Sequence, residues 1–392
     1  MKAVTWHGRR DVRVETVPDP VLVEPTDAII RVTSTGICGS DLHLYEVLGM
    51  FLDEGDILGH EPMGIVEEVG SGVTDLQPGD RVVVPFGIAC GDCFMCGRGL
   101  QSQCETTQVR EQGKGAALFG YTRLYGSIPG GQAEYLRVPM AHYGPIKVPE
   151  GPPDERYVML SDVLPTAWQA VRYGDVEGCS VAVLGLGPIG QMCARIAGHL
   201  GAESVHAIDL VPERLSLAER WGIGTLTWTN GDDVAAALRD LTEGRGPDVV
   251  IDAVGLEAHG SAPEQVLQTL GGLLPDALAD PITQAAGIDR LAALNTAIEA
   301  VRRGGTISLS GVYGGGADPL PLGTMFDKQI QLRMGQANVR RWVDEILPLL
   351  DDDDPLGVHD LVTHTLPLDD APLAYELFQK KRDGAVKVLL QP

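Results

Sequence analysis

The feature that most constrains the fold is "VAVLGLGPIG", residues 181–190, where a short apolar run passes through three glycines into a helical pattern. A strand that turns through Gly-x-Gly-x-x-Gly into a helix is typical of the first βαβ unit of a dinucleotide-binding sheet. Further buried parallel strands are expected at 204–210, 248–255, 305–311 and 329–335, and helices at 190–201 and 213–222. This alternation predicts an α/β fold with a doubly wound Rossmann domain.

The glycine turn carries the candidate cofactor-binding residues. Gly185 and Gly187 permit a tight turn and a close approach of pyrophosphate to the helix N-terminus. Gly190 lets the helix pack closely on the strand, and Pro188 and Ile189 complete the binding turn. The motif is weak alone, but the strand–turn–helix context makes a dinucleotide site the favoured interpretation.

Asp209 ends the next expected strand, where a carboxylate accepts hydrogen bonds from the ribose 2′-hydroxyl and repels a 2′-phosphate. NAD is therefore favoured over NADP. An alternative stays open, because Asp209 could equally cap the helix that follows.

At 392 residues the chain is long enough for two domains. Before the Rossmann pattern, strands punctuated by Gly and Pro are expected at 27–38, 63–73, 80–85 and 130–139, which indicates a compact β-rich domain. From Val358 the pattern returns to strand–helix–strand, and this tail is expected to pack back on the first domain. The expected domains are 1–160, completed by 340–392, and 161–339.

Acidic residues outnumber basic ones, 54 Asp plus Glu against 30 Lys plus Arg, which gives a formal net charge of −24. A field of this sign repels phosphate backbones and anionic lipid, so nucleic acid and membranes are not expected partners. The chain has no apolar run of the roughly 18 residues that a membrane helix needs and no apolar secretion segment near residue 1. The expected location is the cytoplasm.

Four of the seven cysteines lie within fifteen positions, as C-x2-C-x2-C-x7-C: Cys90, Cys93, Cys96 and Cys104. In a reducing compartment such a cluster binds metal more often than it forms disulfides, and four thiolates satisfy tetrahedral Zn²⁺. An iron–sulfur cluster and a pair of disulfides remain as alternatives, although ferredoxin spacing places the last cysteine sooner. We expect a closed, structural zinc site.

Two of the other cysteines, Cys179 and Cys193, are expected to be core thiols, because one opens an apolar strand and the other lies on an apolar helix face. Cys38 is different. It lies in "GICGSDLH", a segment that also holds serine, aspartate and histidine, and "GHEP" follows with a further histidine.

The order of several motifs carries a resemblance to a family. "GICGSDLH", "GHEPMGIVEEVGSGV", "PGDRVVVPF", the cysteine loop, "GGQAEYLRVP" and "GLGPIG" occur in the order found in zinc-dependent medium-chain dehydrogenases. The resemblance covers essentially the whole chain and implies that the β-rich domain is a GroES-like catalytic domain. "LSDVLPTAWQA" and "IDLVPERL" are most similar to the branch of formaldehyde dehydrogenases and dismutases that works without glutathione.

The resemblance implies that Cys38, His60 and Asp162 bind a catalytic zinc ion and leave one coordination position open, which makes two Zn²⁺ per chain. Asp162 could instead be a helix N-cap, since Pro165 follows in the first turn. Glu61 resembles the acidic neighbour that visits the metal during ligand exchange. The alternative is a carboxylate that lies behind the ligands or faces solvent.

Other positions resemble residues that orient a zinc ligand, relay a proton, or line the cofactor and substrate sites. Asp41 resembles the acid that orients the zinc-bound histidine, or it stabilises a turn. Ser40 and His43 resemble a proton relay from the substrate through the nicotinamide ribose to solvent, although either could be a surface residue. Thr166 resembles the residue packed behind the nicotinamide ring, and Phe86 a wall of the substrate pocket.

The sequence also departs from the commoner family pattern. Gly39 stands where many alcohol dehydrogenases carry a basic phosphate contact, so Arg214 and Lys387 become candidates to neutralise the pyrophosphate. The segment 256–303 is longer than usual. In the resembling branch an insertion here traps NAD, but a surface loop or subunit interface is the alternative.

These observations predict a zinc- and NAD-dependent oxidoreductase for a small alcohol or aldehyde hydrate, with formaldehyde-type substrates favoured. A polyol or sugar dehydrogenase of the same superfamily is the first alternative, and a catalytically silent zinc- and nucleotide-binding protein is the second. Family resemblance implies a homodimer or homotetramer.

Overall fold

The computed structural model describes residues 1–150, 153–229, 233–254, 291–311, 320–350 and 353–392. Contacts between residues divide the chain into two compact units. The first joins the two ends of the chain, Met1–Thr166 with Ala337–Pro392, and the second is Ala167–Gln336.

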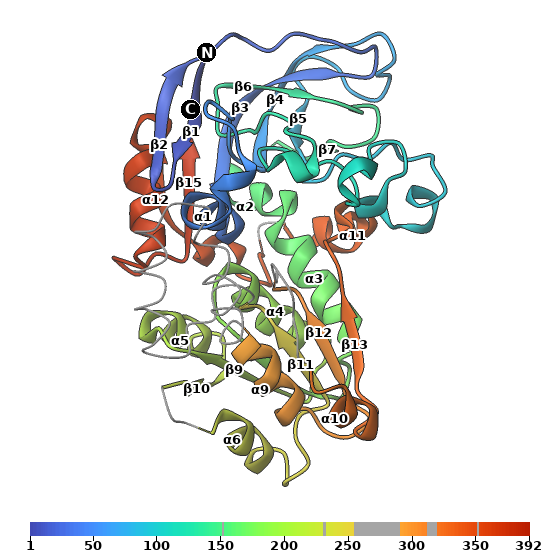
Figure 1. Cartoon of the computed structure of the whole chain (residues 1–392), viewed down its shortest axis with the longest axis vertical. Helices are drawn as coiled ribbons and strands as arrows, with labels where there is room; N and C mark the ends of the chain where they lie inside the picture. Colours follow the sequence, from blue (N-terminus) through green and yellow to red (C-terminus); the bar gives the residue numbers. More distant parts are fainter. Residues whose placement is uncertain (151–152, 230–232, 255–290, 312–319, 351–352) are drawn as a thin grey trace. The chain divides into compact units, whose positions relative to one another are not determined.

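The second unit is built on a six-stranded sheet in the order β10-β9-β8-β11-β12-β13 (Figure 1). Every neighbouring pair in it is parallel. The strands are β8 (Ser180–Leu184), β9 (Ser204–Asp209), β10 (Gly224–Thr227), β11 (Val249–Asp252), β12 (Thr306–Leu309) and β13 (Gln331–Met334). In chain order this is 3-2-1-4-5-6, the doubly wound dinucleotide-binding arrangement, so the predicted fold class is confirmed.

Helices cover both faces of this sheet because its central strands are apolar on both sides. Ala182 and Val250 belong to one core cluster with α6 (Val234–Asp240) and α9 (Ala292–Ala300). Val249 points to the opposite face, where it lies against Gly174 at the end of α3 (Val163–Gly174). The remaining helices of the unit are α4 (Pro188–His199), α5 (Pro212–Glu219) and α10 (Leu322–Asp327).

The first unit is β-rich, as the sequence predicts. A seven-stranded sheet follows the order β14-β15-β3-β4-β5-β7, with β6 paired to β3, and β1 pairs with β2 in a separate ribbon. The strands are β1 (Lys2–Gly8), β2 (Asp11–Thr16), β3 (Ala28–Ile37), β4 (Glu61–Val69), β5 (Arg81–Val83), β6 (Tyr135–Val138), β7 (Ile146–Lys147), β14 (Val362–Pro367) and β15 (Lys387–Gln391).

The chain's C-terminal segment completes this sheet. Strand β15 pairs antiparallel with β3, and β14 pairs with β15 on its other edge. One core cluster joins Val4 of β1, Ile37 of β3, Leu44, Tyr375 and Leu390. Because these residues come from both ends of the chain, the unit forms only when residues more than 300 positions apart meet.

Short helices connect the strands of the first unit. The α-helices are α1 (Gly39–Glu46), α2 (Asp154–Tyr157), α11 (Val339–Ile346) and α12 (Ala371–Gln379). The 3₁₀ turns are η1 (Leu48–Phe51), η2 (Cys96–Arg98), η3 (Gln101–Gln103), η4 (Arg110–Gln112), η5 (Arg123–Tyr125), η6 (Val158–Ser161), η9 (Leu347–Leu349), η10 (Val358–Leu361) and η11 (Leu368–Asp370).

Most of segment 256–303, the long connection singled out in the sequence, lies outside the described residues, and the structure describes it only from residue 291 onward. Within the described part of the segment, the chain forms α9. Among the described helices, none has the length and apolar character needed to cross a membrane.

Candidate functional site

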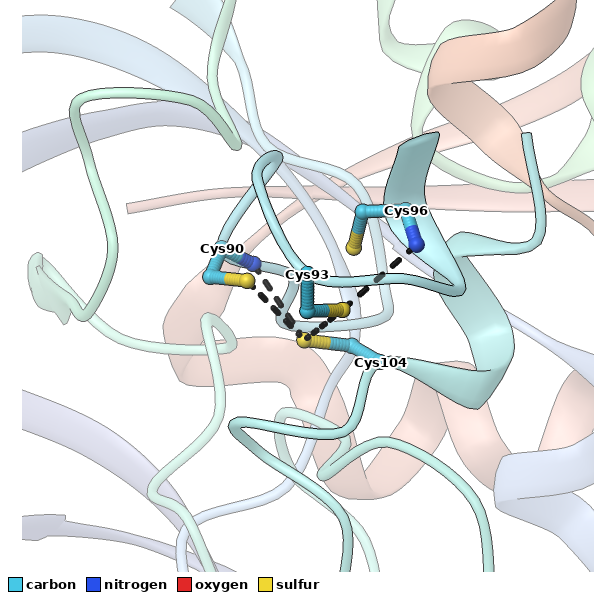
Figure 2. A group of neighbouring side chains, drawn as sticks. All are labelled: Cys90, Cys93, Cys96 and Cys104. Carbon is cyan, nitrogen blue, oxygen red and sulfur yellow. Dashed lines mark hydrogen bonds between the residues drawn. The ribbon is translucent and has the colours of Figure 1, made fainter. Parts of the chain in front are cut away.

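The four clustered cysteines converge in the first unit (Figure 2). Cys104 Sγ lies 3.6 Å from Cys90 Sγ and 4.0 Å from Cys93 Sγ. Four thiolates around one tetrahedral zinc, each at roughly 2.3 Å, would be about 3.8 Å apart. All four thiols are free rather than disulfide-bonded. The spacing fits a single ion and leaves no room for a multi-iron cluster.

Backbone N–H groups favour the ionised form of one of these thiols, Cys93. The Cys96 and Glu105 N–H groups point at Cys93 Sγ, at 3.5 and 3.4 Å. Burial opposes ionisation of Cys93, but these donors lower the pKa of its thiol to about 6. Gly91 has a φ of +84°, and an added Cβ there would lie 2.4 Å from the Tyr143 ring. The loop therefore needs glycine at this position.

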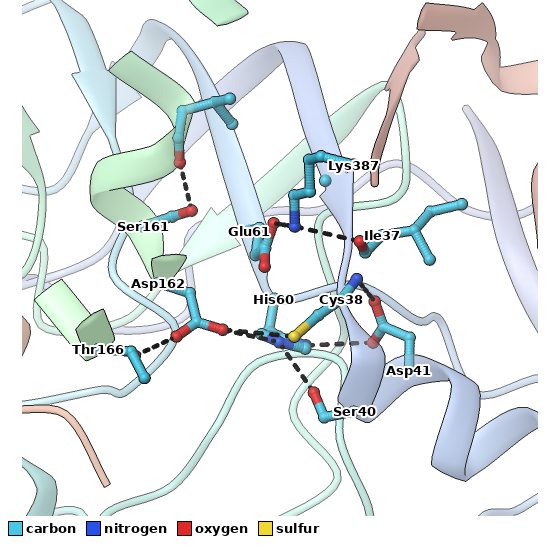
Figure 3. A network of polar contacts seen from close by, with 12 residues as sticks. Ile37, Cys38, Ser40, Asp41, His60, Glu61, Ser161, Asp162, Thr166 and Lys387 are labelled. Atoms are coloured by element: carbon cyan, nitrogen blue, oxygen red, sulfur yellow. Dashed lines mark hydrogen bonds and ion pairs between the residues drawn. The ribbon is translucent and has the colours of Figure 1, made fainter. Parts of the chain in front are cut away.

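A second group of possible ligands lies elsewhere in the same unit: Cys38, His60, Glu61 and Asp162 (Figure 3). Asp162 Oδ2 lies 3.5 Å from both Cys38 Sγ and His60 Nε2. Ligands of a tetrahedral zinc are roughly 3.3 to 3.8 Å apart. The part of the chain that the structure describes contains no third group of this kind.

Three different turns deliver these side chains. Cys38 is the N-cap of α1, His60 directly precedes β4, and Asp162 sits between η6 and α3. The Thr166 hydroxyl, one turn into α3, donates to Asp162 Oδ1 at 2.6 Å. This bond turns the other carboxylate oxygen, Oδ2, toward Cys38 and His60 (Figure 3). The carboxylate thus does more than cap a helix.

The group is strongly anionic and therefore fits a cation. Burial, with help from Asp162 and Glu61, raises the pKa of the Cys38 thiol to about 11. Burial would lower the pKa of His60, but Asp41 and Asp162 outweigh it and raise that pKa well above its usual value. A divalent cation would relieve the repulsion between these acids and let the thiol ionise.

The structure places Asp41 behind His60. Asp41 Oδ1 lies 3.1 Å from His60 Nδ1, and its Oδ2 accepts the Cys38 N–H at 2.9 Å. Asp41 is fully buried. An imidazole held by a carboxylate at Nδ1 presents its Nε2 lone pair to a metal, as the resemblance implies.

Glu61 is buried rather than facing solvent, and it forms an ion pair with Lys387 Nζ. Lys387 is also fully buried and donates to the Ile37 carbonyl at 3.1 Å. Burial disfavours the Lys387 ammonium, but the Glu61 charge raises its pKa. This ammonium is already engaged by Glu61, so the geometry gives no support to a Lys387 contact with cofactor phosphate.

Ser40 Oγ lies 3.3 Å from His60 Nε2, at the candidate metal position (Figure 3). His43 follows one turn along α1 and is half-buried. Two rings stand edge-on to His60: Phe86 with a centroid distance of 6.4 Å and Tyr121 at 6.3 Å. Tyr121 was missed by the sequence analysis, since nothing in its local pattern distinguishes it from a core aromatic residue.

In the second unit the glycine turn joins β8 to α4, which begins at Pro188 and Ile189. A Cβ at Gly190 would lie 1.8 Å from the Gly185 carbonyl oxygen, so helix and strand could not pack as they do. A Cβ at Gly187 would meet nothing closer than 3.9 Å. The open space above Gly187 fits a phosphate approaching the helix N-terminus.

Asp209 ends β9 and is held by the same turn. Its carboxylate accepts N–H bonds from Leu186 at 2.6 Å, Leu210 at 2.7 Å and Val211 at 2.8 Å. These donors precede α5, so Asp209 closes a turn and is not the N-cap of that helix. Arg214 is buried, with Nη1 3.9 Å from Asp209 Oδ2.

The remaining cysteines differ from each other. Cys193 is fully buried, as predicted, and its thiol lies 3.8 Å from the Ala167 carbonyl oxygen. Cys179 is only partly buried. The expectation of a core thiol is wrong there, because Cys179 lies in the turn that precedes β8 and not within the strand.

A parallel dinucleotide-type sheet, together with a β-rich unit that holds two zinc-sized donor groups, defines a zinc-dependent dehydrogenase. The alcohol dehydrogenase GroES-like domain family matches residues 24–150, and the zinc-binding dehydrogenase family matches residues 188–272. The chain belongs to the zinc-type medium-chain alcohol dehydrogenase family, which confirms the resemblance. It is an oxidoreductase with a Rossmann nucleotide-binding domain.

Individual relatives span the whole chain. An uncharacterized zinc-type alcohol dehydrogenase-like protein AdhB of Bacillus subtilis is 42% identical, with all of both chains covered. A formaldehyde dismutase of Pseudomonas putida is 34% identical over 97% of this chain and 95% of its own. The structure of alcohol dehydrogenase TADH from Thermus sp. ATN1 matches with a TM-score of 0.82 and 38% identity, covering 100% of this chain and 99% of its own.

Replacing Cys104 by serine should remove one metal from the protein and lower the free energy of unfolding by on the order of 3 kcal/mol, because a buried ligand is lost from a closed site. Zinc content and melting temperature measure this. Cys179→Ser is the matched control, since Cys179 belongs to neither donor group. Equal zinc content and equal melting temperature in both variants would contradict a structural zinc.

Proposed function

We propose that this protein oxidises a small alcohol, or an aldehyde as its hydrate, by hydride transfer to NAD, with formaldehyde-type substrates favoured. The observation that carries the proposal is the buried group of Cys38, His60 and Asp162 with the Ser40 hydroxyl beside it. Catalysis is assigned to the β-rich unit and NAD binding to the Rossmann unit.

Cys38, His60 and Asp162 would hold the catalytic zinc, with Glu61 next to them, and the four clustered cysteines would hold the structural one. A bound zinc with an open position lowers the pKa of a substrate hydroxyl or polarises a carbonyl. A carboxylate among its ligands donates less charge than a second thiolate, which favours Lewis acidity.

The protein's own residues would carry the substrate proton to solvent and orient the zinc ligands. Ser40 Oγ lies where it can accept the proton of a substrate hydroxyl, and His43, one turn along α1, can pass a proton to water because imidazole titrates near neutral pH. Thr166 orients Asp162 by its hydrogen bond. Asp41 holds His60 in the tautomer that leaves Nε2 available.

The surroundings of His60 favour a small substrate. The rings of Phe86 and Tyr121 stand edge-on to the imidazole and present apolar surface. Burial raises the pKa of Tyr121, so its phenol stays neutral. A polyol would bring several hydroxyl groups against these rings, at a desolvation cost. The similarity to a formaldehyde dismutase also favours a one-carbon aldehyde hydrate.

For the cofactor, NAD is proposed because the Asp209 carboxylate stands at the strand end where a ribose hydroxyl would donate to it. Asp209 Oδ1 accepts two of the three N–H bonds, whereas Oδ2 accepts one and keeps a lone pair for a further donor. Arg214 beside it is the remaining basic candidate for a cofactor contact. A cytoplasmic location and a homodimer or homotetramer complete the proposal.

Removing the charge of Asp209 should shift the cofactor preference toward NADP. Asp209→Asn keeps an acceptor oxygen but loses the repulsion of a 2′-phosphate, so the ratio of kcat/KM for NAD to that for NADP should fall by about 10- to 100-fold. Steady-state rates at varied NAD and NADP concentrations measure this ratio. An unchanged ratio in a folded variant would contradict the assignment.

The proposed reaction is tested by proton NMR of formaldehyde with the purified protein, first without and then with added NAD. With NAD, methanediol should give formate and NADH in equal amounts, with two protons released per turnover. Without it, equal methanol and formate would mean that NAD stays bound and is recycled, which is dismutation. Both results support the proposed chemistry.

Two results would contradict the substrate proposal. NADH formation on a polyol panel but not with formaldehyde would favour a polyol or sugar dehydrogenase. NAD binding without turnover on any alcohol or aldehyde would indicate a catalytically silent protein.

A further inference from the structure

A chain of buried polar contacts, two hydrogen bonds followed by an ion pair, runs from α12, near the C-terminus, to the candidate zinc ligand His60. The Tyr375 hydroxyl donates to Gln132 Oε1 at 2.8 Å. Gln132 Nε2 lies 3.4 Å from Asp41 Oδ2 and 3.2 Å from the Gly36 carbonyl oxygen. Asp41 Oδ1 then faces His60 Nδ1 at 3.1 Å, the link visible in Figure 3.

The chemistry of the partners determines the direction of each hydrogen bond that the Gln132 side chain makes. The Asp41 carboxylate and the Gly36 carbonyl only accept, so the Gln132 amide must present its NH₂ group to them. Its oxygen therefore faces Tyr375, which must donate. Burial, and next the charge of Asp41, raise the pKa of Tyr375 well above its usual value, so the phenol keeps its proton.

Gln132 is itself held on several sides. Its N–H donates to the Leu58 carbonyl at 3.0 Å, and its own carbonyl accepts the Val4 N–H at 2.8 Å. Its side chain lies against Gly59, where an added Cβ would come within 2.3 Å of Gln132 Cγ. The residue is fully buried and anchored next to the strand start that carries His60.

We propose that Gln132 and Tyr375 are positioning residues that hold Asp41 against His60 and so keep His60 Nε2 directed at the catalytic metal. The inference rests on the proposed function, because the positioning matters only if His60 binds zinc. It assigns a role in the site to the helix α12, which is more than 300 residues from His60 in the sequence.

The role of Tyr375 follows from what its loss would do. Without the hydroxyl, Gln132 Oε1 loses the donor that the structure gives it and is left unsatisfied in a buried place, which is unfavourable. A shift of the amide toward another donor would relieve that cost but weaken its bond to Asp41. Asp41 would lose one donor, keep only the Cys38 N–H and His60, and hold the imidazole less firmly.

The test compares Tyr375→Phe with Tyr45→Phe in the zinc-loaded protein. Tyr45 is a matched control, since it is buried and its ring centroid lies 5.4 Å from that of Tyr375. Its hydroxyl takes no part in the chain that leads to Asp41. Gln132→Met, which keeps the side-chain length but removes both polar atoms, is the second variant.

The readout is the rate of zinc release to a chromogenic chelator, together with the absorption spectrum of protein carrying Co²⁺ at the Cys38 site. Changing the direct partner of a metal-bound histidine typically costs 10- to 100-fold in metal affinity. Tyr375 and Gln132 act on His60 only through Asp41, so a smaller effect is expected. Tyr375→Phe and Gln132→Met should speed the release of one of the two zinc ions by about fivefold and shift the cobalt bands. Tyr45→Phe should change neither.

The outcomes separate this inference from the proposed function. Release rates and cobalt spectra equal to wild type in both Tyr375→Phe and Gln132→Met would overturn the positioning role. Faster release of both ions, with a lower melting temperature, would indicate only a structural role and would overturn it too. If wild-type protein holds a single zinc and Asp162→Ala holds the same amount, the catalytic metal site itself fails, and the proposed function fails with it.

Discussion

The burial of acidic groups around His60 is the constraint on which the rest of this site depends. Asp41 and Glu61 are at most 1% exposed, and Asp162 and the Cys38 thiol lie beside them. Buried charges need opposite charges or several donors. Cys38, Asp41, Glu61 and Asp162 would carry four negative charges when all are ionised, and a zinc ion bound to neutral His60 would add two positive charges to that of Lys387. The Lys387 ammonium, the Thr166 hydroxyl and the Gln132 amide each place a donor against one of these acids and so offset part of the negative charge.

The two groups of candidate zinc ligands are built in different ways. The cysteine loop closes on itself, and backbone N–H groups within it lower the pKa of Cys93. The His60 group is assembled from distant parts of the chain and is held by side chains, including two from the C-terminal segment. A closed loop suits a structural ion, whereas a site built from several elements can leave one position for substrate.

The sequence predicted what depends on local pattern or on motifs shared with the family, including the group Cys38, His60 and Asp162, and it missed individual side-chain contacts outside those motifs. Five strands of the Rossmann sheet and the cysteine spacing were readable because apolar runs and short ligand spacings are local signals. Strand β10 was missed because its four residues carry a weak pattern. Nothing local connects Lys387 to Glu61, or Gln132 to Tyr375, since each pair meets only after the two ends of the chain have joined in one unit.

The central claim is that Cys38, His60 and Asp162 hold a catalytic zinc distinct from the structural one. Metal analysis of the wild-type protein and of Asp162→Ala tests this most directly, with formaldehyde turnover and melting temperature measured on the same samples. The account predicts two zinc ions in the wild type, one in the variant, loss of turnover and a preserved fold with NAD still bound. Two zinc ions and full turnover in Asp162→Ala would contradict it.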